Sequence, residues 1–504
     1  MTGMGIGLIV FVALFFLLGL ATFWMVRGSG KRYIVCGKTM PLAFVATMLT
    51  AQSIDANSTI GNTSLTYIGG FWSGFSIPLG LAACLLLTGL FFAKPLNRMN
   101  LLTLPDFYFR RYSSGVELLT SVLMGISFII LVAGNLAGCA WIVKVVFNLP
   151  YLPSLIIVAA TILAYSVAGG LFASASTDFV QIYPAIVGFV GAVIWMIATY
   201  GWEPLMRAVP SGFMDLSGLI SPRQGAFVNW GQIMALALGD IVALDFMERV
   251  FSARTPRTAQ VGCYIGAGLT LITGVACSLL GIMSISLLPG IADPRMVLPN
   301  LAMNVVPFVF GLLLMCGVIG AGASTANGGI LGVSIVLGRN ILQKNILRWR
   351  AERKAGKENG SASGSAANIF MSDRRLLLIS RIMALPVVLL AVVLAWVRPE
   401  PGILLALAFD VVFAGCFVPL AGGLFWKKAN TAGALAAILA GSSLRALLYV
   451  TIPDHLKGLD TLIPPVFSLL VFAVVCLLTQ DRFPSKHHVV QEIPCDADVI
   501  AGIV

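Results

Sequence analysis

The sequence predicts an all-α, polytopic membrane protein with about thirteen membrane-spanning helices. The chain of 504 residues is 58% hydrophobic and only 11% charged, whereas a soluble protein carries about 25% charged residues. Its mean hydropathy is +0.95. Apolar runs of the ~20 residues needed to cross a bilayer recur along the chain, and basic residues collect between them. Composition, run length and charge placement therefore all favour a multi-pass protein of the cell membrane.

The predicted spans follow one another closely and form one transmembrane domain over residues 1–480, followed by a tail over 481–504. In chain order the spans are 3–26, 41–70, 71–93, 115–147, 153–170, 176–200, 229–251, 260–289, 304–338, 376–397, 402–425, 430–452 and 462–480. The first run resembles a signal peptide, but no basic residue precedes it, and Arg27, Lys31 and Arg32 follow it. This order is typical of a first span whose N-terminus lies outside.

The basic residues between the spans predict the orientation of the chain. Loops assigned to the outside, 201–229 and 452–461, are poor in Lys and Arg. Basic segments assigned to the inside are 27–38, 94–111, 249–257, 344–375 and 427–428. The alternation puts the N-terminus outside and the C-terminus inside. The Gly/Ser/Ala-rich loop 341–375 is predicted to be a flexible cytoplasmic linker, and the tail 481–504 a cytoplasmic extension.

Composition and motif content exclude several function classes. The net charge of +11 resides in short loops, so it does not indicate a nucleic-acid partner. The nine cysteines are scattered singly and the three histidines lie outside the apolar spans, so neither a metal site nor a disulfide framework is predicted. The sequence contains no soluble domain of useful size and no catalytic motif in the context that its chemistry requires. We therefore expect no enzyme activity, no cofactor and no obligatory protein partner.

A polar segment, AQSIDANSTIGN over 51–62, interrupts the second span. A carboxylate at bilayer depth costs about 2.5–3.5 kcal/mol even on lenient insertion scales, so Asp55 indicates either a function or a buried partner. Ser, Asp, Asn, Thr and Gly in quick succession are weak helix formers and predict a broken helix. Such a break is tolerated where it lines a cavity or is buried in protein. The alternative role for Asp55 is a buried pair with an amide or an Arg from another helix, and Arg445 is the main candidate.

A second polar group, GAGASTANGG over 320–329, lies in the middle of span 304–338. Ser324 and Thr325 follow Ala321 by three and four residues, so the three share one helix face. The Ala321 carbonyl and the two hydroxyls offer oxygen atoms without formal charge, which suits a weakly bound hard cation. Carbonyls freed by a helix break near 51–54 would complete the cage. The small residues alone would also suit close helix packing.

Further polar groups lie in spans 115–147 and 229–251. Asp240 lies near the middle of its span, where it would be either a cavity ligand or one member of a buried pair. Glu248 and Arg249, nearer the inner face, fit a solvated helix end. Asn135 is a candidate cavity residue, although a lone Asn in a span more often forms a hydrogen bond between helices.

Five segments in chain order carry a resemblance to a known family. They are TLPDFYFRRY (103–112), YSVAGGLFASASTDFVQ (165–181), ERVFSARTPRTAQ (248–260), ASTANGGIL (323–331) and VPLAGGLFWKKANTAGAL (418–435). Together, and at the expected spans, they resemble the sodium:solute symporter family, which includes sodium–sugar, sodium–proline, sodium–pantothenate and sodium–sialic acid carriers. The resemblance covers residues 31–480.

The resemblance implies a LeuT-type core of two inverted five-helix repeats, which would occupy 41–200 and 229–425. Span 3–26 would precede this core, and two helices within 430–480 would follow it. It also implies one sodium site, with ligands carried over residue by residue: the carbonyls of Ala51, Ile54 and Ala321 and the hydroxyls of Ser324 and Thr325. Asp178 would lie near the cytoplasmic exit of that ion.

The chain departs from the family pattern at three places, one of which is near Arg339 and Asn340, where an acidic residue usual near the end of span 304–338 is replaced. Asn327, Gly328 and Gly329 replace an Asp-Ser-Gln sequence. Ser58 stands where sugar carriers have a glutamine that faces the substrate. A sugar is therefore not favoured, and no substrate carries over from the resemblance.

We predict sodium-coupled secondary active symport of a small organic solute into the cell by alternating access. The residues expected to face the solute are Asp55, Asn57, Ser58, Asn135 and Asp240. The uncompensated acid among them favours an amine-bearing or cationic solute. Sodium between spans 41–70 and 304–338 would favour the outward-open state. The alternatives are a proton-coupled carrier, with Asp55 or Asp240 as the titrating group, and a transport-like membrane sensor.

Overall fold

Helices dominate the described structure. The computed structural model describes residues 3–22, 30–347 and 373–486. Within these ranges no β-strand forms, and one isolated backbone bridge joins Met40 to Ala253. The all-helical class predicted from composition is confirmed. The tail beyond 486 and most of the loop 341–375 lie outside the described residues, so their predicted roles stay predictions.

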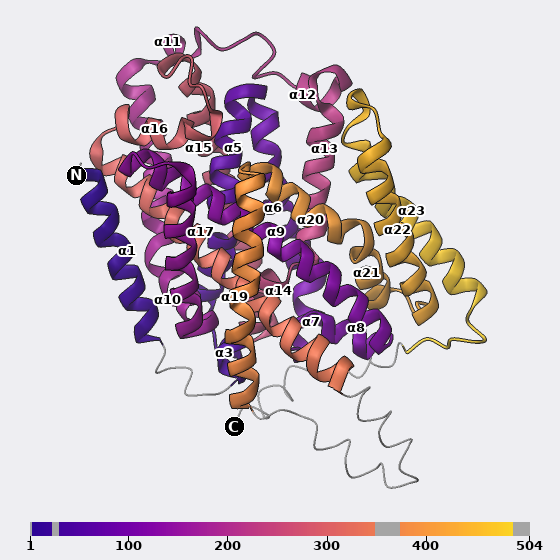
Figure 1. Ribbon diagram of the computed structural model, residues 1–504. Helices are drawn as coiled ribbons and strands as arrows, with labels where there is room; N and C mark the ends of the chain where they lie inside the picture. Colours follow the sequence, from indigo (N-terminus) through magenta and orange to yellow (C-terminus); the bar gives the residue numbers. More distant parts are fainter. Residues whose placement is uncertain (1–2, 23–29, 348–372, 487–504) are drawn as a thin grey trace.

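The helices of the bundle run side by side, with α1 at one edge and α22 and α23 at the opposite edge (Figure 1). They are α1 (Gly3–Ala21), α4 (Leu42–Ser53), α5 (Ala56–Gly69), α6 (Phe71–Leu87), α9 (Ser114–Phe147), α10 (Tyr151–Tyr200), α13 (Ala226–Met234), α14 (Leu244–Ser252), α15 (Pro256–Leu287), α17 (Phe308–Ile335), α19 (Asp373–Val397), α20 (Pro401–Gly415), α21 (Phe417–Phe425), α22 (Thr431–Thr451) and α23 (Leu459–Leu478). Short helices lie at the two ends of the bundle: α3 (Gly30–Val35), α7 (Ala93–Arg98) and α8 (Pro105–Arg111) at one end, and α11 (Trp202–Met206), α12 (Ser217–Ile220) and α16 (Val297–Asn304) at the other.

The apolar helices correspond to the predicted spans. In the described ranges, eight are long and apolar enough to cross a membrane, or up to ten if each of two bent pairs counts as one span. The bent pairs are 226–242 with α14, at 53°, and α20 with α21, at 48°. Shorter apolar helices, Gly3–Gly19, Leu42–Ser53 and Tyr151–Ala164, stand where further spans are predicted. Every predicted span overlaps one of these segments, whereas the count of thirteen and the orientation stay predictions.

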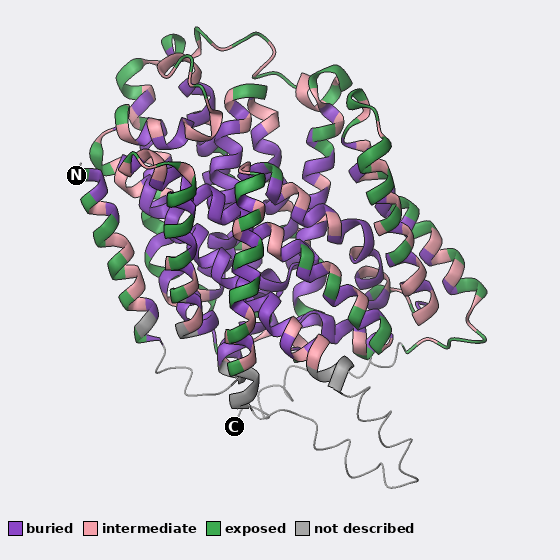
Figure 2. Cartoon of the chain, in the orientation of Figure 1, coloured by how far each residue is buried: buried purple, intermediate pink, exposed green. Residues whose placement is uncertain are grey.

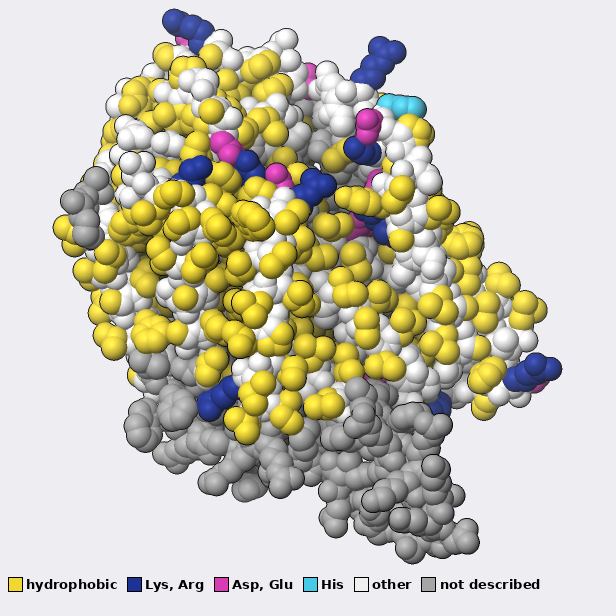
Figure 3. Space-filling view, in the orientation of Figure 1, with side chains coloured by type: hydrophobic (Ala, Val, Ile, Leu, Met, Phe, Trp, Pro, Cys, Tyr) yellow, Lys and Arg dark blue, Asp and Glu magenta, His cyan; other side chains and the backbone are white. Residues whose placement is uncertain are grey.

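The outer surface of the bundle is apolar, as the interior is. Buried residues fill the middle of the bundle and exposed residues follow the outer helices (Figure 2). Large hydrophobic side chains are among the exposed ones, such as Leu14 at 60% and Ile194 at 62%. On one face, hydrophobic side chains form a broad band, and charged side chains lie mainly towards the two ends of the helices (Figure 3). A bilayer requires such a surface.

A single residue divides the longest helix. α10 has 50 residues, and Gly170 within it has φ +58° and ψ −143°, a conformation that glycine adopts without steric cost. A Cβ atom on Gly170 would lie 2.5 Å from the Tyr33 ring. The sequence predicts two spans here, 153–170 and 176–200. The structure joins them through this glycine and continuing helix, without a loop.

Candidate functional site

The polar segment 51–62 contains the predicted break in the second span. α4 ends at Ser53 and α5 begins at Ala56, so Ile54 and Asp55 lie between two helices. Asp55 is the N-cap of α5, and its Oδ1 atom accepts a hydrogen bond from the Ser58 N–H at 2.8 Å. A carboxylate at a helix N-terminus satisfies a free N–H group and interacts favourably with the helix dipole. The break is therefore confirmed, and the local sequence stabilises it.

The end of α4 leaves backbone carbonyl groups without helical partners. The Thr50 carbonyl accepts a hydrogen bond from the Ile54 N–H at 3.0 Å. The carbonyls after it, from Ala51 to Ile54, have no further helical turn to donate to them. Ala51 and Ile54 are buried and pack against Ile182 of α10. These are the carbonyls from which the sequence predicts half of a sodium site.

The other half of the predicted sodium site lies inside α17. Ala321, Ser324 and Thr325 are at most 1% exposed. Within the described residues, the Ser324 Oγ and Thr325 Oγ1 atoms form no hydrogen bond of normal distance and angle. Leaving a buried polar group unpaired costs about 1–3 kcal/mol, so buried hydroxyls normally have a partner. Two adjacent buried hydroxyls, of which Ser324 has the Asp178 carboxyl beside it, suit a ligand that brings positive charge.

Three contacts show that α17 and the helix break lie beside the same segment of α10. A Cβ atom on Gly322 would lie 2.7 Å from the Ala56 Cβ, so α17 touches the first residue of α5. Asp178 of α10 is buried and interacts with Ser324 of α17. One turn later on α10 lies Ile182, which packs against the end of α4. Residues predicted from two distant spans are thus brought to one junction, with Asp178 beside it.

Four of the five residues predicted to face the solute belong to one hydrogen-bonded group. Asn135 Nδ2 of α9 donates to Asp55 Oδ2 at 2.7 Å. Asn57 Nδ2 donates to the Leu131 carbonyl at 3.1 Å and, with a longer bond of 3.4 Å, to Asp55 Oδ2. The Ser58 hydroxyl donates to the Asp55 carbonyl at 3.1 Å. Both carboxylate oxygens of Asp55 therefore have protein donors.

Arg445, the predicted candidate, does not pair with Asp55. Arg445 of α22 forms buried ion pairs with Asp410 of α20 and, at 3.0 Å, with Asp460 of α23. Its charge is therefore used to join the last helices of the bundle. The amide alternative is confirmed instead, because Asn135 holds the Asp55 carboxylate.

The fifth residue, Asp240, lies at a second helix break that the sequence analysis missed. The helix that begins with α13 changes its hydrogen-bonding pattern after Met234, ends at Val242 and bends by 53° into α14. Ala243 at the bend has extended backbone, with φ −71° and ψ 135°. Asp240 is buried, and its Oδ1 accepts a hydrogen bond from Gln52 Nε2 of α4 at 3.1 Å. A hydrogen bond between side chains thus joins the two broken helices.

Glu248 and Arg249 are buried, which contradicts the solvated helix end predicted for them. Arg249 forms an ion pair with Asp245 at 2.7 Å. Gly328 of α17 provides the space, since a Cβ atom there would lie 3.1 Å from the Asp245 Cβ and 3.2 Å from Arg249 Nη1. The glycine that departs from the expected Asp-Ser-Gln pattern is therefore where an ion pair of α14 packs.

The polar centre of the molecule is closely packed. A cavity of about 10 Å³ lies between the α4–α5 break, α6 and α15. Its lining residues are Ser53, Ile54, Ser58, Thr59, Asn62, Pro78, Thr270, Thr273, Gly274 and Cys277. This volume is about that of one water-sized probe. This cavity is therefore too small to hold an organic solute.

Comparison with known proteins decides the family. A model described as the sodium:solute symporter family matches residues 33–356 and 367–441. The chain belongs to the sodium:solute symporter family. This symporter is a multi-pass membrane transporter and not an enzyme, and sodium is its coupling ion.

Two relatives and one solved structure illustrate the symporter's likenesses. The high affinity choline transporter 1 of Homo sapiens is 25% identical over 461 residues, which cover 87% of this chain and 76% of that protein. The sodium/pantothenate symporter of Escherichia coli (strain K12) is 26% identical over 456 residues, which cover 88% of this chain and 89% of that protein. A substrate-bound, outward-open structure of a Na+-coupled sialic acid symporter is similar with a TM-score of 0.72 at 14% identity, covering 95% of this chain and 98% of that one. This structural likeness confirms the expected LeuT-type fold in outline.

Proposed function

We propose that this symporter carries a small organic cation, such as an amine-bearing solute, into the cell together with sodium by alternating access. The observation that carries the proposal is the junction of α4, α10 and α17. The Ala51 and Ile54 carbonyls lie at the end of α4, the Ser324 and Thr325 hydroxyls lie in α17, and both groups lie beside the segment of α10 that contains Asp178 and Ile182. Neutral oxygen atoms of this kind suit Na+, and the Ala321 carbonyl would complete the set.

Sodium at this junction would attract both α4 and α17 and so stabilise one arrangement of the two helices. A ligand shifts a conformational equilibrium only as far as it prefers one state. An ion held by two spans has that preference, because it loses half of its ligands when the spans separate. Asp178, buried beside Ser324, would lie on the path of the ion to the inside.

The charges near the two helix breaks favour a cationic solute. Asp55, Asp240 and Asp245 are buried there, and Arg249 is paired with the last of them. Buried charge is costly unless it is compensated, and a cation would supply the compensation. Asp240 is the better candidate contact than Asp55, since its Oδ2 atom has no hydrogen bond of normal geometry within the described residues. The likeness to a choline transporter supports the same solute class.

We also propose that the N-terminus lies outside, the C-terminus lies inside, and inverted repeats occupy 41–200 and 229–425. The two helix breaks support these repeats, because each proposed repeat begins with a broken span. A C-terminal fusion to alkaline phosphatase should be inactive in bacteria, whereas a fusion to green fluorescent protein should fluoresce. Phosphatase activity at the C-terminus would contradict the orientation.

Uptake by purified symporter in proteoliposomes tests the proposed function. Choline as a cation and pantothenate as an anion are the probes, with an inward sodium gradient or with potassium in its place. We expect choline uptake that requires sodium, and no pantothenate uptake. If the symporter takes up pantothenate but not choline, the proposed solute class is wrong. If a pH gradient drives choline uptake in the absence of sodium, the carrier is coupled to protons instead.

Variants of α17 test the sodium site itself. Ser324→Ala/Thr325→Ala should lose sodium-dependent uptake or need far more sodium. Ser334→Ala is the matched control, since Ser334 is also a buried, unpartnered hydroxyl on α17 but lies beyond the junction. An unchanged sodium requirement in the double variant would overturn the assignment.

A further inference from the structure

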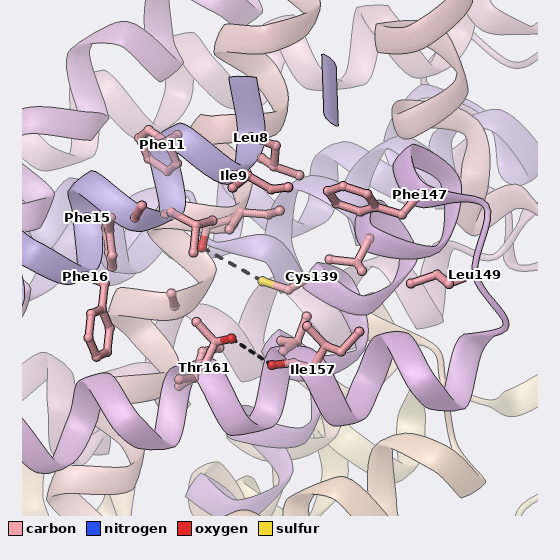
Figure 4. Close-up of a pocket in the computed structure, with 18 residues that line it drawn as sticks. Leu8, Ile9, Phe11, Phe15, Phe16, Cys139, Phe147, Leu149, Ile157 and Thr161 are labelled. Carbon is pink, nitrogen blue, oxygen red and sulfur yellow. Dashed lines mark hydrogen bonds between the residues drawn. The ribbon is translucent and has the colours of Figure 1, made fainter. Parts of the chain in front are cut away.

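An apolar cavity of about 520 Å³ lies between α1, α9, α10 and α17, apart from the polar centre. Figure 4 shows side chains from these helices around it, including Phe11 and Phe15 of α1 and Phe147 of α9. The volume falls within the ~300–1,000 Å³ that ligand sites usually have. It shares no lining residue with the cavity beside the α4–α5 break, so the two cavities are separate.

The lining of this cavity has no free polar group to offer. Among its lining residues, Thr161 and Cys139 carry the polar side-chain atoms. Thr161 Oγ1 donates to the Ile157 carbonyl at 2.8 Å, and Cys139 Sγ contacts the Ile319 carbonyl at 4.0 Å, as the dashed lines in Figure 4 mark. No lining side chain is charged. A polar molecule would lose its hydration here without compensation, so the occupant must be apolar.

The cavity continues into the surface that faces the bilayer. Ile9 of α1 and Ile157 of α10 line it and are 48% and 49% exposed. At the inner end, Cys139 and Val143 of α9 line it and are only 1% and 8% exposed. Lipid hydrocarbon thus has access at one end. An apolar space left empty would forfeit dispersion contacts on all of its walls.

We propose that this cavity holds an acyl chain of a membrane phospholipid. The chain enters between α1 and α10, while its headgroup stays outside the cavity at the membrane surface. Continuity with the bilayer-facing surface and the absence of free polar atoms in the lining carry this choice. The acyl chain fills the gap between α1 and the rest of the bundle and so attaches α1 to it.

The acyl chain also contacts the helix that carries the sodium ligands. Ile319, Gly320 and Ala323 of α17 line the cavity, and the next residue is Ser324. An occupied cavity restrains the position of this turn of α17. This consequence rests on the proposed function, and it predicts that filling or emptying the cavity changes the sodium concentration needed for half-maximal uptake.

Photolabelling of the symporter in phosphatidylcholine nanodiscs tests the proposal. The probe is a phosphatidylcholine with a diazirine in one acyl chain, and labelled residues are mapped by mass spectrometry. We expect labels on Cys139 and Val143, which lipid at the outer surface does not reach. Labels confined to residues that are exposed and do not line the cavity, such as Ile6 and Ile156, would overturn the proposal. So would loss of the inner labels on adding free fatty acid but not on adding unlabelled phosphatidylcholine.

Matched variants sharpen the test. Val158→Phe fills the cavity from α10 and should reduce the inner labels several-fold, whereas Ile156→Phe on the outward face of α10 should leave them unchanged. Val12→Phe fills the cavity from α1 and should act like Val158→Phe, which guards against a folding defect in one variant. Inner labels that survive both filling variants would contradict the proposal. Labelling needs neither sodium nor transport, so its failure would leave the sodium site untouched.

Discussion

At Asp55, one carboxyl group serves two structural purposes. It caps α5 through the Ser58 N–H, and it accepts a hydrogen bond from Asn135 of α9. The cap fixes where the second half of the broken span begins, and the Asn135 bond fixes α9 beside it. Asp55 therefore shapes the polar centre whether or not it contacts a solute.

Two substitutions of Asp55 distinguish its role as a helix cap from the role of its negative charge. Asp55→Ala should destabilise the symporter by about 2–4 kcal/mol, because it removes an N-cap and leaves Asn135 with only a long hydrogen bond of 3.4 Å to the Leu131 carbonyl. Asp55→Asn should cost less, since Asn is an equally good N-cap. Thermal denaturation in detergent measures the difference. Equal stability of the two variants would contradict the cap, and an Asn variant that is stable but inactive would make Asp55 the contact to the solute.

Residue spacing predicts contacts within one helix but not between helices. The shared face of Ala321, Ser324 and Thr325 follows from helical periodicity alone, and the structure keeps all three buried in α17. From the sequence, Arg249 is predicted to be a solvated charge, because it lies at the end of a span. Its burial depends on Gly328 of α17, which leaves room for the ion pair with Asp245. No pattern near Arg249 in the sequence reveals a glycine that lies so far along the chain.

At the scale of helices, the two breaks differ in how far the sequence reveals them. The α4–α5 break follows from a run of weak helix formers around Asp55. The α13–α14 break lies in ALALGDIVALDF, which is rich in good helix formers. Its local signal is the Gly239–Asp240 pair. Gly239 packs against the Phe409 carbonyl of α20, where a Cβ atom would lie 2.4 Å away, so tertiary packing overrides helix propensity there.

The crossing of α5 and α20 requires glycine on both helices. A Cβ atom on Gly61 would lie 2.5 Å from the Gly402 Cα. Gly61→Ala should therefore separate the helices at a cost of about 1–3 kcal/mol, which exceeds the roughly 0.5–1 kcal/mol that Ala gains in helix propensity. Gly125→Ala in α9 is the control, since its Cβ would meet nothing within 4 Å. Thermal denaturation compares the two, and equal midpoints would contradict the close crossing.

The ion pairs of Arg445 join α20, α22 and α23. Arg445→Met leaves Asp410 and Asp460 buried without a cation, so we expect a loss of about 3–5 kcal/mol. Adding Asp410→Asn and Asp460→Asn to the same variant should restore much of the loss, because the uncompensated charge is removed. Lys457→Met, in an exposed ion pair with Asp454, should leave the denaturation midpoint unchanged. If the added substitutions do not reduce the loss of stability in Arg445→Met, uncompensated charge is not the cause of that loss.

For the whole molecule, composition and charge placement were enough to predict a helical bundle in a membrane, and five motifs were enough for the family. The packing at the centre was not predictable, because it depends on contacts between distant spans. Gln52 of α4 meets Asp240 only after the second break has formed, and Ile182 of α10 meets the end of α4 only in the folded bundle. The cavity of about 10 Å³ beside the α4–α5 break is too small for a solute, so the proposed alternating access would require the helices around it to rearrange.

That rearrangement couples the two ligands, and the coupling is measurable without transport. Ligands that favour the same arrangement of helices strengthen each other by the same factor, typically about 5–150-fold. Choline should therefore raise the thermal denaturation midpoint more in sodium than in potassium, and sodium should bind more tightly when choline is present. Scanning fluorimetry with each ligand titrated at fixed concentrations of the other measures both directions. In Ser324→Ala/Thr325→Ala the two effects should become independent, whereas Ser334→Ala should retain the coupling. A choline shift of equal size in both salts, with the native junction intact, would mean that sodium and solute do not share the α4–α10–α17 arrangement.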